Sequence, residues 1–256
     1  MKICRFIVFG DNDIRFGVIK DKTIFSLLHS GIYNAELIQS DEVFAFSEVN
    51  FLPPVSPSKI VCVGRNYAEH AAELGNEVPK EPLLFLKAPT SLITNGEAII
   101  LPPQTNQVEH EGELAVVIGR TAKNLSETEN PLDYVFGYTC LNDVTARDLQ
   151  RRDVQFTRAK SFDTFCPIGE FIETELDPTN LKIQVRVNDE LKQQGNTAQM
   201  VFPVGFLIRY VSNQMTLLPG DIIATGTPSG VSRLNAGDVC SVEIEGIGIL
   251  SNPVAQ

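Results

Sequence analysis

The stretch His110-Glu111-Gly112-Glu113-Leu114-Ala115-Val116-Val117-Ile118-Gly119 places two carboxylates at the head of a continuous apolar run. The apolar residues predict a buried strand, in which side chains at i and i+2 point to the same face about 6–7 Å apart. Two carboxylates this close repel each other unless a cation lies between them. Oxygen ligands favour Mg²⁺, Mn²⁺ or Ca²⁺ over zinc. Glu111 and Glu113 are therefore candidate ligands of one divalent cation, and a solvated acidic strand face is the alternative.

The composition of the chain is acidic. Its 256 residues include 21 Lys and Arg against 32 Asp and Glu, which gives a net charge of −11 and a pI near 4.8. This balance argues against nucleic acid and anionic membranes as partners. Five scattered cysteines without a C-x-x-C pattern argue against a disulfide framework or a zinc knuckle. The first residues lack the apolar core of a signal peptide, and no run approaches the ~20 apolar residues of a membrane span. We therefore expect a soluble cytoplasmic protein.

A proline-rich segment divides the chain. Leu52-Pro53-Pro54-Val55-Ser56-Pro57 blocks regular structure and predicts a linker. Before it, the pattern predicts strands over residues 2–9 and 14–20 and a helix near 35–39. We therefore expect a small N-terminal α+β module over residues 1–54 and a larger domain over residues 55–256.

Beyond the linker, short apolar runs bounded by turn residues predict many strands and few helices. The predicted strands cover 59–64, 83–86, 98–101, 114–118, 135–141, 168–172, 183–187, 190–193, 221–225, 239–244 and 248–250, and the predicted helices cover 66–74 and part of 201–213. The regular alternation of a doubly wound sheet is missing, so we expect a β-rich α+β fold.

Asp143 opens a second polar segment, Asp143-Val144-Thr145-Ala146-Arg147-Asp148-Leu149-Gln150. If this segment is a helix, Asp143, Arg147 and Gln150 fall at i, i+4 and i+7 on one face. Such a face is typical of a surface ion pair. It also fits a third metal ligand beside a clamp for an anion, and the spacing alone leaves both interpretations open.

A histidine and a glutamate share one turn of the predicted helix over residues 66–74. His70 and Glu73 stand at i and i+3, where side chains are neighbours on a helix. A carboxylate beside an imidazole fixes its tautomer and raises its basicity, which suits a general base. A solvent-exposed helix pair is the alternative interpretation.

Two lysines and a glycine-rich segment are further candidates. Lys87 ends the apolar run 83–87, and Lys160 precedes another apolar run. Each lysine either extends its ammonium group to solvent or holds a substrate carboxylate or a developing oxyanion. The segment Thr225-Gly226-Thr227-Pro228-Ser229-Gly230-Val231 allows the backbone to approach a ligand closely, although turn formation explains its glycines equally well.

Together these segments resemble the fumarylacetoacetate hydrolase superfamily, whose members include acylpyruvases, oxaloacetate decarboxylases and 2-hydroxyhepta-2,4-diene-1,7-dioate isomerases. The resemblance covers roughly residues 57–250, in the family's order. Its motifs are Gly64-Arg65-Asn66-Tyr67 with His70 and Glu73, Leu84-Phe85-Leu86-Lys87, His110-Glu111-Gly112-Glu113-Leu114, Asn142-Asp143-Val144-Thr145-Ala146-Arg147-Asp148, Ala159-Lys160-Ser161-Phe162-Asp163 and Gly220-Asp221-Ile222-Ile223-Ala224-Thr225-Gly226-Thr227-Pro228. Ser232-Arg233 departs from a glycine-proline pair that is frequent in relatives.

The resemblance implies a mixed β-sandwich roll that works as a homodimer, with the small N-terminal module of bacterial members. It implies one Mg²⁺ or Mn²⁺ per subunit, with open positions for substrate. The residues that match the family's site are the metal ligands Glu111, Glu113 and Asp143, the catalytic residues His70, Glu73 and Lys160, and the substrate contacts Arg147, Gln150, Lys87 and Thr227.

The family acts on 2-oxo acids that form an enolate, whose charge the metal stabilises. We expect C–C bond hydrolysis of an acylpyruvate-type acid, in which His70 deprotonates water, or decarboxylation of oxaloacetate. The alternatives are a 2-oxo-enoate hydratase, a 2-hydroxyhepta-2,4-diene-1,7-dioate isomerase, an oxaloacetate tautomerase and a non-catalytic binding module. Retention of the dyad, Lys160 and all three carboxylates argues against the binding module.

Overall fold

The structure is a computed structural model that describes residues 1–28, 31–33 and 37–256. Strands dominate it, as expected. They are β1 (Lys2–Val8), β2 (Arg15–Lys20), β3 (Thr23–Leu27), β4 (Gln39–Ala45), β5 (Val49–Leu52), β6 (Ile60–Gly64), β7 (Leu83–Lys87), β8 (Leu92–Ile93), β9 (Ile99–Ile100), β10 (Val108–Glu109), β11 (Gly112–Ile118), β12 (Val135–Asn142), β13 (Thr145–Ala146), β14 (Cys166–Pro167), β15 (Phe171–Glu173), β16 (Lys182–Val187), β17 (Glu190–Asn196), β18 (Ile222–Ala224), β19 (Val239–Ile244) and β20 (Gly248–Ala255).

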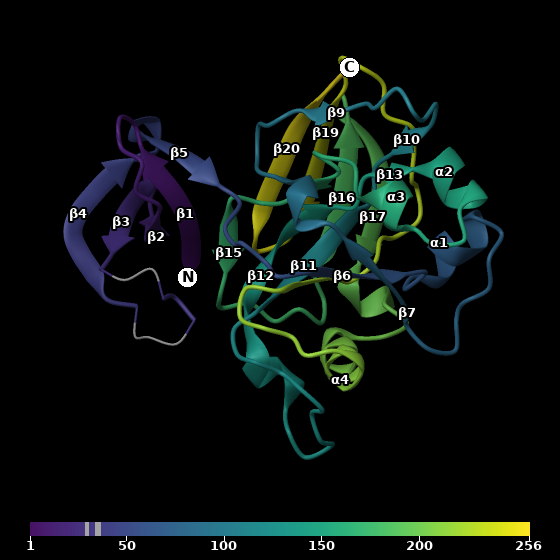
Figure 1. The fold of residues 1–256 in the computed structure, drawn as a ribbon, viewed down its shortest axis with the longest axis horizontal. Helices are drawn as coiled ribbons and strands as arrows, with labels where there is room; N and C mark the ends of the chain where they lie inside the picture. The colour runs from purple at the N-terminus through teal and green to yellow at the C-terminus, as the bar shows by residue number, and fades with distance from the viewer. Residues whose placement is uncertain (29–30, 34–36) are drawn as a thin grey trace.

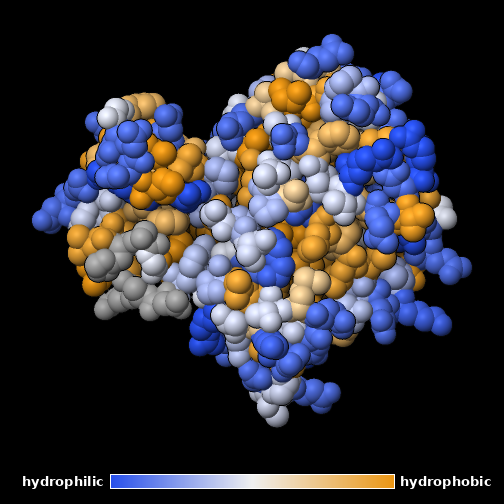
Figure 2. Space-filling view, viewed as in Figure 1, coloured by the Kyte–Doolittle hydropathy of each residue, from blue (hydrophilic) through white to orange (hydrophobic). Residues whose placement is uncertain are grey.

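The α-helices of the described residues are short and few. They are α1 (Ala68–Glu73), α2 (Arg147–Arg152), α3 (Thr157–Lys160) and α4 (Val204–Gln214). Within the described ranges, no helix is long and apolar enough to cross a membrane. Figure 2 shows hydrophilic residues over much of one face of the molecule, with hydrophobic residues between them.

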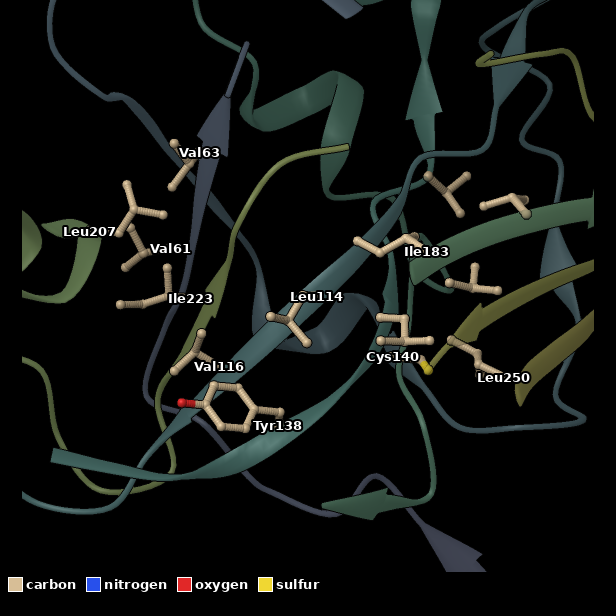
Figure 3. Close-up of a cluster of buried hydrophobic side chains, with 14 of the residues drawn as sticks. Val61, Val63, Leu114, Val116, Tyr138, Cys140, Ile183, Leu207, Ile223 and Leu250 are labelled. Carbon is tan, nitrogen blue, oxygen red and sulfur yellow. The ribbon is translucent and has the colours of Figure 1, made fainter. Parts of the chain in front are cut away.

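Two sheets enclose the main core. A large sheet has the order β4-β3-β2-β1-β15-β12-β11-β18-β6-β7, with β5 also paired to β1, and a second sheet has the order β17-β16-β19-β20-β9. Figure 3 shows Leu114 and Cys140 of the large sheet in one cluster with Ile183 and Leu250 of the second sheet. All neighbours in these two sheets are antiparallel except β18 with β6 and β20 with β9. The expected mixed β-sandwich is therefore confirmed.

The N-terminal strands continue the large sheet. Strand β1 pairs antiparallel with β15, with Lys2 opposite Glu173 and Cys4 opposite Phe171. The same strand pairs with β2 and β5, so that β1 joins the module to the larger domain (Figure 1). The module also has a small core of its own, formed by Cys4, Phe6, Ile24 and Val49.

Three local predictions differ from the structure. The strand expected over 168–172 is not continuous, because Ile168 forms only an isolated bridge with Leu141 and β15 begins at Phe171. The helix expected from Asp143 begins only at Arg147, because Thr145 and Ala146 pair with β10 as β13. Of the helix expected near 35–39, residues 35 and 36 lie outside the described residues, and Gln39 already pairs with β3.

Candidate active site and metal centre

Three buried carboxylates converge at one end of the β11–β12 pair. Gly112 is opposite Asn142 in the register, so Asp143, one residue beyond, lies beside Glu111 and donates its backbone N–H to the Glu111 carbonyl oxygen at 2.8 Å. One carboxylate oxygen from each of Glu111, Glu113 and Asp143 lies within 4.8 Å of the others. The acidic pair is therefore part of a buried triad and not a solvated strand face.

Gly112 explains why two glutamates fit at the start of β11. Alternation along the strand turns residue 112 to the face opposite Glu111 and Glu113. On that face a Cβ atom at residue 112 would collide with Val185 of the second sheet. Glycine therefore lets the two sheets pack closely, while its two neighbours point to the other side.

Lysine and arginine side chains form ion pairs with two of the three carboxylates, those of Glu111 and Asp143. Lys160 Nζ donates to Glu111 Oε2 and to Asp143 Oδ2, each at 2.7 Å. Arg147 Nη2 donates to Glu111, and its Nε donates to Glu109 Oε2 at 2.7 Å. Burial alone would raise the pKa of Glu111, but Lys160 and Arg147 hold that pKa well below its usual range. These two cations therefore favour the charged form of Glu111.

Glu113 has a different environment. Its carboxylate accepts one hydrogen bond, from the Gly226 backbone N–H at 2.7 Å, and within the described part of the chain no cationic side chain forms an ion pair with it. Burial, and then the charges of Asp143 and Glu111, raise the pKa of Glu113 well above its usual value. A divalent cation among the three carboxylates would remove this repulsion, and the oxygen-only ligand set fits Mg²⁺ or Mn²⁺.

Asp143 lies in a different local structure from the one that the i, i+4, i+7 spacing predicted. It follows the end of β12 and is not on the helix that carries Arg147 and Gln150. Those two residues do share one turn of α2, where Arg147 Nη1 donates to Gln150 Oε1 at 2.5 Å. Both of them line the same cavity as Asp143.

Lys87 lies behind the triad and does not line the cavity. Its side chain is fully buried, and Nζ donates to Asp143 Oδ1 at 2.7 Å, to the Val144 carbonyl oxygen at 3.3 Å and to the Lys160 carbonyl oxygen. The ammonium group is therefore enclosed by protein acceptors. Lys87 therefore supports Asp143 and Lys160 in this structure, and its expected contact with substrate stays a prediction.

We expect Lys87→Met to weaken divalent-metal binding about 10–100-fold, the usual scale for a residue that orients a metal ligand. The substitution removes one of the two cations that hold Asp143, so unfolding in urea should also begin at a lower concentration. Titration calorimetry with Mg²⁺ measures the affinity. Lys123→Met, at an exposed position, is the control. Unchanged metal affinity in Lys87→Met would show that Asp143 does not depend on this lysine.

His70 and Glu73 form a pair beside the triad. His70 Nδ1 lies 3.2 Å from Glu73 Oε2, and His70 is 5% exposed. The Gly230 backbone N–H donates to both oxygens of Glu73, at 3.0 and 3.2 Å. Gly230 has a φ of +101°, and a Cβ atom there would collide with the Lys192 carbonyl oxygen, so glycine is required. The glycine-rich segment thus holds Glu73, and Glu73 orients His70.

Thr227 closes the cavity beside Glu113. Its hydroxyl donates to the Gly112 carbonyl oxygen and accepts from Gln193 Nε2, each at 2.8 Å. His110 lies outside the cavity and contacts Gln193 Oε1 at 3.0 Å and Ser232 Oγ at 2.8 Å. Burial lowers the pKa of His110, which is consistent with a neutral structural role.

The cavity that these residues share has a volume of about 420 Å³. Besides the predicted residues, its lining includes Arg65, Phe85, Arg151 and Phe156, which the sequence patterns did not single out. The rings of Phe85 and Phe156 meet edge to face with centroids 5.6 Å apart. Phe85 and Arg65 fall inside the motifs quoted for the family resemblance, and their position there was the available signal.

Comparison with known proteins places the chain in a family. The family described as Fumarylacetoacetate (FAA) hydrolase C-terminal matches residues 59–255, and the one described as Rv2993c-like, N-terminal matches residues 1–54. The chain therefore belongs to the fumarylacetoacetate hydrolase family and carries an Rv2993c-like N-terminal module. This confirms the resemblance and the fold class expected from the motifs.

Individual relatives have several names. The chain is 44% identical to oxaloacetate tautomerase YisK of Bacillus subtilis, over 81% of this chain and 70% of that protein. The structure of 2-hydroxyhepta-2,4-diene-1,7-dioate isomerase from Mycobacterium marinum has a TM-score of 0.89 and 38% identity, over 100% of this chain and 98% of that one. Fumarylpyruvate hydrolase from Pseudomonas aeruginosa, in complex with Mn²⁺ and pyruvate, has a TM-score of 0.74 and 30% identity, over 84% and 92%.

Proposed function

We propose that the protein is a divalent-metal-dependent tautomerase of 2-oxo acids, and that it interconverts the keto and enol forms of oxaloacetate. The observation that carries this proposal is the His70–Glu73 pair, which lines one cavity together with the buried triad. Such a pair moves a proton, and proton transfer alone completes a tautomerisation. The similarity to YisK, named an oxaloacetate tautomerase, supports this alternative over the C–C hydrolysis that the motifs first suggested.

The residues of the triad would hold one Mg²⁺ or Mn²⁺ per subunit. The presence of Mn²⁺ in the related fumarylpyruvate hydrolase supports this assignment. A bound divalent ion supplies Lewis-acid stabilisation of the negative charge that develops on the 2-oxo oxygen when a C3 proton leaves. Lys160 Nζ donates to Glu111 and to Asp143, and its ammonium group places a further positive charge at the wall of the cavity.

His70 is the proposed proton carrier. Its Nδ1 atom faces Glu73, so Nε2 is the nitrogen left to take up a proton. In the conversion of the keto form, Nε2 accepts the proton from C3, and the same proton returns to the 2-oxo oxygen to give the enol. The reverse reaction runs through the same steps. Atoms balance without water or another reactant, whereas acylpyruvate hydrolysis requires a positioned water molecule.

A panel of substrates tests the reaction assignment. With Mg²⁺ present, we expect the decay of the enol absorbance of oxaloacetate to be accelerated far more than the cleavage of acylpyruvates or the turnover of 2-oxo-enoates. Faster acylpyruvate cleavage than oxaloacetate tautomerisation would identify a hydrolase instead. Bound metal without turnover of any of these acids would identify a binding module.

Assembly and domain division are further parts of the proposal. We propose that the protein is a homodimer, as the family resemblance implies, and that residues 55–256 form the catalytic domain beside a module of residues 1–54. Light scattering coupled to gel filtration measures the mass of the assembly, and a mass equal to one 28.2 kDa chain would contradict the dimer.

A further inference from the structure

Arg65 is a cavity-lining cation in an unusual backbone conformation. It follows β6 directly, and its φ is +57°. Residues with a Cβ atom rarely adopt this left-handed conformation, and it persists only where the surrounding structure determines it. Such strained positions cluster at ligand-binding sites, so the backbone conformation of Arg65 suggests that this residue has a role in binding.

The neighbouring asparagine holds Arg65 in this conformation. Asn66 is fully buried, and its Nδ2 atom donates to the Thr225 carbonyl oxygen at 2.7 Å and to the Phe202 carbonyl oxygen at 3.1 Å. Its Oδ1 atom accepts from the Phe202 backbone N–H at 2.8 Å. These bonds join the end of β6 to two distant segments. Arg65 is therefore presented to the cavity from a rigid base.

The other cations that line the cavity already have partners. Lys160 bridges Glu111 and Asp143. Arg147 is shared among Glu109, Glu111 and Gln150, and Arg151 Nη1 donates to Gln107 Oε1 at 3.3 Å. In contrast, the guanidinium group of Arg65 makes no hydrogen bond or ion pair with any residue that the structure describes. Its five donors are available to a ligand.

The charge of the cavity lining points to the kind of ligand. Four cationic side chains, Arg65, Arg147, Arg151 and Lys160, face four carboxylates, Glu73, Glu111, Glu113 and Asp143. A divalent ion on the triad would leave a surplus of two positive charges. A 2-oxo monocarboxylate neutralises one of these charges, whereas a 2-oxo dicarboxylate neutralises both.

We propose that Arg65 is a specificity-determining residue that binds the carboxylate farthest from the 2-oxo group, so that the site selects 2-oxo dicarboxylates over monocarboxylates of equal length. The planar guanidinium group binds a carboxylate through two parallel hydrogen bonds, which matches this role. The inference rests on the proposed function, because it takes the 2-oxo acid end of the substrate to lie at the triad.

Binding of two stable analogues tests the role of Arg65. Malate and 2-hydroxybutanoate have the same carbon skeleton and differ in a terminal carboxylate against a methyl group. Calorimetry of the Mg²⁺-loaded protein should show malate bound about tenfold more tightly, the scale of one charge-assisted hydrogen bond. Arg65→Gln should abolish this preference without changing 2-hydroxybutanoate binding, and Arg65→Lys should keep part of it. Gln and Arg are both unbranched at Cβ, so the backbone conformation costs both residues alike.

A kinetic measurement separates this inference from the proposed function. Exchange of the C3 hydrogens in D₂O, followed by NMR, reports enolisation of oxaloacetate and of 2-oxobutanoate. At low substrate concentration, we expect Arg65→Gln to slow the exchange of the C3 hydrogens of oxaloacetate. The exchange of 2-oxobutanoate should not change. Arg158→Gln is the matched control, because Arg158 pairs with Asp153 at the surface outside the cavity.

Each outcome decides one of the two proposals. If neither 2-oxo acid exchanges but malate is preferred through Arg65, the tautomerase proposal fails and the role of Arg65 stands. If the unmodified protein shows no preference for malate, the role of Arg65 is overturned. If Arg65→Gln weakens the binding of malate and of 2-hydroxybutanoate equally, the role of Arg65 is also overturned. A general structural defect would then explain the loss of affinity.

Discussion

Glu113→Gln should remove divalent-metal binding and tautomerase activity while leaving the metal-free protein at least as stable. Glu113 is the triad member without an ion pair among the described residues, so a neutral amide relieves repulsion from Glu111 and Asp143. The amide oxygen can still accept from the Gly226 N–H. We expect a loss of metal affinity above the ~100-fold limit seen for residues that only orient a ligand.

Thermal unfolding with and without Mg²⁺ checks both halves of this expectation. Metal at one hundred times its dissociation constant stabilises the native protein by about 2.7 kcal/mol, and this gain should be missing in Glu113→Gln. Glu243→Gln, at an exposed position of β19, should retain it. Wild-type metal affinity in Glu113→Gln would remove Glu113 from the ligand set.

His70→Ala should lower the rate of oxaloacetate tautomerisation by about 10²–10⁴-fold, the range for loss of a positioned acid–base group. Metal affinity should change little, because the hydrogen-bond partner of His70 is Glu73 and not a triad carboxylate. Glu73→Gln should also slow the reaction, since it removes the charge that orients the imidazole.

Paired measurement of rate and Mg²⁺ affinity tests the role of this histidine. Glu69→Gln is the control, because Glu69 lies on the same helical turn and is exposed but does not line the cavity. Loss of rate and of metal affinity in equal measure in His70→Ala would indicate a structural role. An unchanged rate would assign the proton transfer to another group.

Local sequence patterns predicted most of the strands, and most of the candidate residues that they singled out line one cavity. The i, i+2 spacing at the start of β11 correctly predicted that Glu111 and Glu113 lie close together, because strand periodicity depends only on neighbouring residues. Asp143 does lie beside the two glutamates, as expected, but the local structure predicted for its segment was wrong. The pairing of β13 with β10 delays the helix, and such a pairing between distant segments leaves no periodic signal.

Residues whose roles depend on tertiary contacts were harder to predict. Lys87 ends a strand in sequence, yet only the fold encloses it between Asp143 and the Lys160 backbone. The role proposed for Arg65 depends on its lack of a partner among the described residues and on anchoring by Asn66, neither of which a motif encodes. Phe156 enters the cavity from the segment between α2 and α3, where no pattern marks it.

The pairing of β1 with β15 has a consequence for the chain as a whole. Without β1, the backbone amide and carbonyl groups of β15 that face it would be unpaired, and an unpaired strand edge recruits strands from other molecules. A strand near the start of this sequence thus covers the edge of β15, which lies more than 160 residues later in the chain. A chain lacking residues 1–54 would expose this edge, and intermolecular strand addition leading to aggregates would be its characteristic failure.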